Sequence, residues 1–71
     1  MTDAEVARDI QDIRKHLKRM RCSMTSVSHL LDKDMPLKDK AVELEKLARD
    51  CVYHSEVIEE IAIRWRIALQ V

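Results

Sequence analysis

Glycine is absent from this 71-residue chain, which has a single proline, Pro36, and only two aromatic residues, Tyr53 and Trp65. Without glycine, the chain cannot form the phosphate-binding loops or dinucleotide-binding turns that depend on that residue. Folds rich in β-strands are disfavoured as well, because they need tight turns and large aromatic or β-branched faces. A chain that is 37% charged and rich in good helix formers is instead typical of long helices.

The sequence also lacks long apolar runs. No stretch approaches the roughly 20 residues that a membrane-spanning helix requires, and the first residues do not resemble a secretory signal. Cys22 and Cys51 have no CxxC spacing and are too few for a disulfide framework. Because 13 basic residues balance 13 acidic ones, the whole molecule has no strong field that would attract an anionic partner. These features predict a cytoplasmic protein that does not bind membranes.

Catalytic and metal-binding patterns are missing. His16, His29 and His54 are scattered and form no HExxH motif or other ligand pair at helical spacing. Glu56 and Glu60 lie one helical turn apart, but no Glu-x-x-His motif accompanies them. We therefore expect no catalytic residues, no metal site and no cofactor, and we expect that the protein is not an enzyme.

Apolar residues recur with a seven-residue period on both sides of the proline. The first run is Val6, Ile10, Ile13, Leu17, Met20, Met24, Val27 and Leu31. The second is Leu37, Ala41, Leu44, Ala48, Cys51, Ser55, Ile58, Ala62, Trp65 and Leu69. Alternating steps of four and three keep such residues on one side of an α-helix, as in coiled coils. The sequence therefore predicts two long helices whose apolar stripes face each other.

Local signals place the ends of these helices within a single domain, residues 1–71. Thr2 and Glu5 match the capping box, so the first helix should run from about residue 3 to about residue 33. Pro36 disfavours helical geometry at Met35 but is tolerated in a first turn, so residues 34–36 should form a turn. The second helix should then run from about residue 36 to about residue 69. A short connection predicts an all-α antiparallel hairpin.

A hairpin of this size seldom stabilises itself, because each helix buries only one stripe. The second helix carries further apolar residues outside its stripe, so we expect two hairpins to form a homodimeric four-helix bundle. The residues predicted for this dimer or for a partner interface are Tyr53, Val57, Ile61, Ile63, Trp65, Ile67 and Val71.

Residues 61–71 allow a second interpretation. Every odd position in this segment is apolar, which is also the period-two pattern of a β-strand. We favour a helix, because the preceding helical pattern runs on in phase. A strand would make this segment a candidate for pairing with the sheet edge of a partner.

The one local concentration of charge is a basic stretch in the first helix, comprising Arg14, Lys15, Lys18, Arg19 and Arg21. It has three interpretations, which are a solvated structural surface, a site for an acidic protein partner, and a site for nucleic acid. The preceding acidic residues can pair with these cations at helical spacings. The first helix also has no aromatic residue on which bases could stack.

These observations favour a small non-enzymatic regulatory protein that dimerises through long helices and binds another protein. It would act as an inhibitor, an anti-activator or an adaptor, with a transcription factor as one kind of target. The alternatives are an RNA- or DNA-binding bundle that uses the basic stretch, and a structural subunit of a larger assembly.

Overall fold

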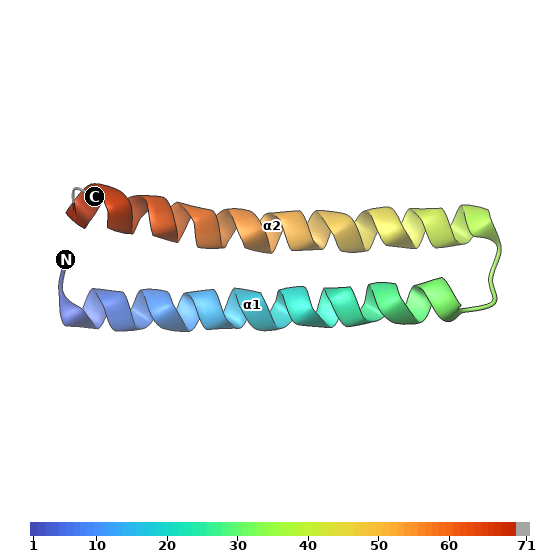
Figure 1. The fold of residues 1–71 in the computed structure, drawn as a ribbon, viewed down its shortest axis with the longest axis horizontal. Coiled ribbons are helices and arrows are strands. Elements are labelled where there is room, and N and C mark those ends of the chain that lie inside the picture. Colours follow the sequence, from blue (N-terminus) through green and yellow to red (C-terminus); the bar gives the residue numbers. More distant parts are fainter. Residues whose placement is uncertain (70–71) are drawn as a thin grey trace.

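The computed structural model describes residues 1–69, which form two long α-helices joined by a short turn. Helix α1 spans Asp3–Asp32 and helix α2 spans Leu37–Leu69. They lie side by side and antiparallel, so the start of α1 and the end of α2 meet at one end of the hairpin (Figure 1). The prediction of an all-helical hairpin is confirmed. Residues 61–69 are helical, and Val71 lies outside the described residues.

The helix ends are fixed by local hydrogen bonds. The Thr2 hydroxyl oxygen accepts a hydrogen bond from the backbone N–H of Glu5 at 3.2 Å, as expected of an N-cap. At the turn, the backbone carbonyl of Pro36 accepts the first bond of α2, from the N–H of Lys40 at 3.0 Å. The Lys40 ammonium in turn donates to the carbonyl of Leu31 at 3.4 Å. A cation of α2 thereby stabilises the carbonyl end of α1.

The interface between the helices uses one predicted column of residues and replaces the other. Heptad positions are assigned with Val6 and Leu44 at position a. Leu37, the first a residue of α2, is 80% exposed, so its predicted place in the interface was wrong. The other a residues are half-buried, as the sequence predicts, and they are Val6, Ile13, Met20 and Val27 on α1, and Leu44, Cys51, Ile58 and Trp65 on α2. The second column is d, formed by Asp9, His16, Ser23 and Leu30 on α1, and by Lys40, Leu47, His54 and Ile61 on α2. The apolar stripes predicted from the sequence consist of positions a and e. The expectation that the e residues would form the second column of the interface was wrong.

The e residues of α1 lie outside the interface. Ile10, Leu17, Met24 and Leu31 are 37%, 38%, 61% and 58% exposed. The interface is thus turned by about 50° from the apolar stripe, since successive residues are about 100° apart around a helix. Apolar periodicity misplaced it because the d column of α1 contains Asp9 and His16, whose polar groups find partners across the hairpin.

The hairpin has a thin apolar core. Among residues 1–69, Leu30 and Ile61 are the buried hydrophobic residues, at 8% and 5% exposure. The radius of gyration is 16.3 Å, whereas a compact domain of this length would have a radius of about 11 Å. In the described part of the chain, neither helix contains a stretch that is both long and apolar enough to span a membrane.

Candidate protein-association face

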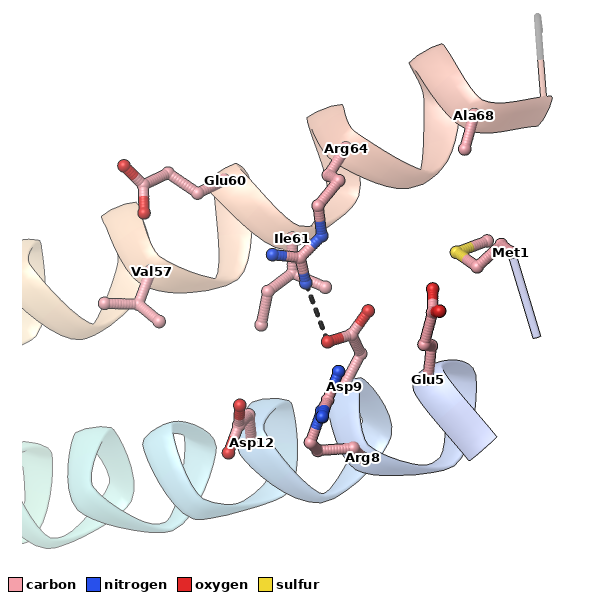
Figure 2. Close-up of a pocket in the computed structure, with 10 residues that line it drawn as sticks. All are labelled: Met1, Glu5, Arg8, Asp9, Asp12, Val57, Glu60, Ile61, Arg64 and Ala68. Atoms are coloured by element: carbon pink, nitrogen blue, oxygen red, sulfur yellow. Dashed lines mark hydrogen bonds and ion pairs between the residues drawn. The ribbon is translucent and has the colours of Figure 1, made fainter. Parts of the chain in front are cut away.

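A carboxylate holds the open end of the hairpin together. Asp9 is 5% exposed, and aspartate is rarely buried unless it is paired. Its Oδ2 accepts a hydrogen bond from Trp65 Nε1 at 2.8 Å, and its Oδ1 accepts one from Arg64 Nη2 at 2.7 Å. Figure 2 shows Arg64 reaching from α2 toward Asp9, beside Ile61. The two donors place residue 9 of α1 within about one helical turn of residues 64 and 65 of α2.

These contacts change the acidity of the carboxyl group. The hydrogen bond from Trp65 is the largest influence, and it holds the pKa of Asp9 below its ordinary value of 3.8. Burial acts in the opposite direction, and the hydrogen bond and charge of Arg64 add to the lowering. The ionised form of Asp9 is therefore the one that stabilises the hairpin.

We expect Asp9→Asn to make the hairpin less stable at neutral pH and less sensitive to acid. Because the folded-state pKa of Asp9 is depressed, its contribution is complete above the unfolded-state value near 3.8 and is lost as the pH falls through the folded-state value. Thermal unfolding midpoints measured from neutral pH down to about pH 2 should fall less for Asp9→Asn than for the wild type. The exposed Asp12→Asn is the control, and parallel pH profiles for the wild type and Asp9→Asn would contradict this account.

A second polar pair lies near the middle of the hairpin. His16 Nδ1 and His54 Nδ1 are 2.6 Å apart, so one ring must donate and the other accept. The ring of Tyr53 packs edge-on, with its centroid 6.1 Å from that of His16 and 5.1 Å from that of His54. This pair places residue 16 level with residue 54. Within residues 1–69, no group of three or more His, Cys, Asp and Glu is arranged to hold a metal ion.

Polar grooves follow one side of the hairpin. The residues that line these grooves show which heptad positions of the two helices lie on this side, and therefore which lie on the opposite side. The lining of the grooves includes Glu5, Asp12, Val57 and Arg64 near the open end, Arg19 and Asp50 in the middle, and Ser26 and Glu43 near the turn. All of these residues occupy position g. Because the g residues of both antiparallel helices meet on this side, the e residues of both helices share the opposite side.

The e residues form one continuous surface, which we call the e-face. It consists of Ile10, Leu17, Met24 and Leu31 from α1, and of Ala41, Ala48, Ser55, Ala62 and Leu69 from α2. All of them are exposed, and α1 contributes large side chains where α2 contributes mostly small ones. In soluble proteins, contiguous exposed apolar surfaces larger than a few hundred Å² are typical of interaction sites. Sequence reasoning missed the e-face, because these residues were assigned to the interior of the hairpin.

Three of the residues predicted for a dimer or partner interface are engaged within the hairpin. Ile61 is buried at position d, and Trp65 is half-buried at position a, where its indole donates to Asp9. Val57 is half-buried and lines the groove at the open end. Contacts within one chain therefore account for much of the apolar surface of these three side chains.

Three others lie on the side of α2 turned away from α1. Tyr53, Ile63 and Ile67 occupy positions c and f and are 58%, 39% and 68% exposed. We call these residues the outer patch. It is separated from the e-face by more than about 90° around the axis of α2.

The residues of the basic stretch point in different directions. Arg14 and Arg21 occupy position b, directly beside the e-face, and both are exposed. Lys15, Lys18 and Arg19 line the middle groove on the other side of α1. The stretch is therefore divided between two sides of the helix and does not form one basic surface.

Comparisons of the chain with protein-family models, with curated proteins and with solved structures find no match.

Proposed function

We propose that this chain is a small non-enzymatic regulatory protein that forms a homodimer through the e-face and binds another protein through the outer patch. In the dimer, two hairpins make a four-helix bundle. The bundle modulates its target by covering part of the target's surface, as an inhibitor, an anti-activator or an adaptor does. A transcription factor is one kind of target that fits this role.

The observation that carries this proposal is the excess surface of the single hairpin. Its accessible surface is 5932 Å² for a mass of 8.3 kDa, whereas a compact monomer of that mass would expose about 4,600 Å². The excess of about 1,300 Å² is larger than the roughly 800 Å² that each partner buries in a standard protein interface. Association with a second chain is the direct way to cover it.

The e-face and the outer patch are separate apolar surfaces, and this separation supports the proposal that each binds a different partner. A second copy on the e-face leaves the outer patch exposed, because the patch lies on the far side of α2. Tyr53 provides an aromatic anchor with a polar end, and side chains of this kind often dominate binding energy. Ile63 and Ile67 lie one turn apart and extend the patch along the helix. The bundle therefore presents two copies of the patch to its target.

The test combines mass measurement with partner capture. Sedimentation equilibrium should give the wild type twice the chain mass of 8.3 kDa. The double variant Ile63→Glu, Ile67→Glu should stay dimeric, but it should capture at least about tenfold less of the protein that copurifies stoichiometrically with the wild type. Val42→Glu is the matched control, since Val42 is 60% exposed on the outer side of α2 near the turn.

Other results would contradict the proposal. If Val42→Glu lost the captured protein as readily as the double variant, binding would not depend on the outer patch. Recovery of a large assembly with many subunits would favour a structural role instead. Recovery of RNA or DNA that is released steeply by salt would favour the nucleic-acid alternative.

A further inference from the structure

The two helices contribute side chains of complementary size at each level of the e-face. The contacts of Asp9 with Arg64 and Trp65, and of His16 with His54, limit the alignment of the two helices to within about one helical turn. Within that range the e residues lie level in pairs, which are Ile10 with Ala62, Leu17 with Ser55, Met24 with Ala48, and Leu31 with Ala41. Each level thus carries one large side chain from α1 and one small side chain from α2.

Charges at the edges of the e-face are also complementary. Arg14 lies at position b of α1, directly beside the e-face, and Glu59 occupies the same position on α2. The alignment of the level pairs places these two residues within about one residue of the same level. Both side chains are exposed, and neither of them forms an ion pair in the part of the chain that the structure describes.

A second hairpin can cover the e-face in two symmetric ways. A two-fold axis parallel to the helices places α1 of each copy on α2 of the other and keeps every residue at its own level. A two-fold axis perpendicular to the helices places α1 on α1 and α2 on α2. The perpendicular arrangement would set large side chains on large ones, and would place the α1 cations Arg14 and Arg21 along the same helix of the other copy.

We infer that the second copy binds with the two-fold axis of the dimer parallel to the helices, an inference that rests on the proposed homodimer. The small α2 side chains of the second copy receive the large α1 side chains of the first hairpin, and the reverse occurs at the symmetric contact. Arg14 of each chain pairs with Glu59 of the second copy at the rim. This pair favours the inferred orientation of the dimer, because unlike charges meet in this arrangement and like charges in the other. Of the other b-position cations, Arg21 and Arg66 lie level with Val52 and Ala7 and gain no partner, and Lys38 lies beside the turn.

Charge reversal tests the orientation. The first variant carries Arg14→Glu, the second carries Glu59→Arg, and the third carries both substitutions. In the inferred dimer, each of the first two variants places like charges at two rim contacts, so its dissociation constant should rise at least about fivefold. The third variant should return to within about twofold of the wild type, because opposite charges meet again. Dissociation constants from sedimentation equilibrium at low salt provide the measurement, and circular dichroism checks that helix content is kept.

A matched control separates local pairing from net charge. Arg19→Glu changes the net charge by the same amount as the first variant, but Arg19 faces the groove on the other side of α1. This control should leave the dissociation constant within about twofold of the wild type, since its side chain points away from the second copy and exposed charges interact weakly through solvent.

The outcomes distinguish this inference from the proposed function. A wild-type dimer that the first two variants leave unchanged would overturn the orientation while leaving the e-face dimer intact. Weakening by the first two variants without recovery in the third would also overturn it. A wild type that stays monomeric at all accessible concentrations would overturn the proposed homodimer, and the orientation with it.

Discussion

Leu17→Glu is expected to convert the dimer into monomers. Leu17 lies near the middle of the e-face and is 38% exposed in the single hairpin, so a second copy would bury it almost completely. A glutamate at this position would lose its hydration without gaining a partner, which costs several kcal/mol for each copy. The dissociation constant should therefore rise at least about a hundredfold, because every 1.4 kcal/mol is about a factor of ten.

Sedimentation equilibrium and the concentration dependence of the thermal midpoint measure this effect. The wild-type midpoint should rise with chain concentration, whereas that of Leu17→Glu should not. Leu37→Glu is the matched control, since Leu37 is 80% exposed at the start of α2 and lies outside the e-face. A Leu17→Glu chain that remains dimeric at micromolar concentration would rule out the e-face as the site of association.

Ile61→Ala is expected to have the largest effect on stability within the single hairpin. Ile61 is 5% exposed and is one of the two buried apolar residues of the described chain. Truncating a buried isoleucine to alanine costs about 2–5 kcal/mol, while a chain of this size rarely has more than about 3–5 kcal/mol of stability. Much of the variant should be unfolded at room temperature.

Thermal unfolding followed by circular dichroism, at one fixed chain concentration, measures this loss. The midpoint should fall by about 10 °C or more, since 1 kcal/mol shifts it by about 4–8 °C in a domain of this size. Ile67→Ala makes the same substitution on the same helix at a residue that is 68% exposed, and it should shift the midpoint by no more than about 4 °C. Equal losses in the two variants would show that Ile61 is not part of the core.

The two helices and the reversal at Pro36 could be predicted because local signals decide them. Helix propensity, the cap at Thr2 and the backbone restrictions of proline act over a few residues, and no tertiary contact opposes them. The a column could be predicted as well, because apolar residues such as Ile13 and Leu44 recur there on both helices.

The choice between the d and e columns could not be predicted from apolar periodicity. On α1 the e column is wholly apolar, while d includes Asp9, His16 and Ser23, so periodicity favoured e. The structure favours d because two of these polar side chains are satisfied by specific residues about forty or more positions away, His54 and Trp65. Contacts of such long range are not contained in the pattern of one helix.

One signal for the correct column was present in the residue types. Asp9, His16 and Ser23 do not provide it, because Glu5, Asp12 and Arg19 are equally polar at the same seven-residue spacing on an exposed column. Trp65 does, because the indole N–H of a partly buried tryptophan requires an acceptor. That requirement could have indicated a polar residue of α1 between the helices.

The polar contacts between α1 and α2 also determine which misfolded hairpins are excluded. If the helices slid past each other by one heptad, Asp9 would lie beside Ile58 in place of Trp65, and its carboxylate would lose its two donors. His16 would lose its hydrogen bond to His54 in the same step. An aliphatic zipper tolerates such slippage with little penalty, but a buried charge does not. The buried charge of Asp9 therefore selects a single register of the two helices within one chain, before a second molecule binds.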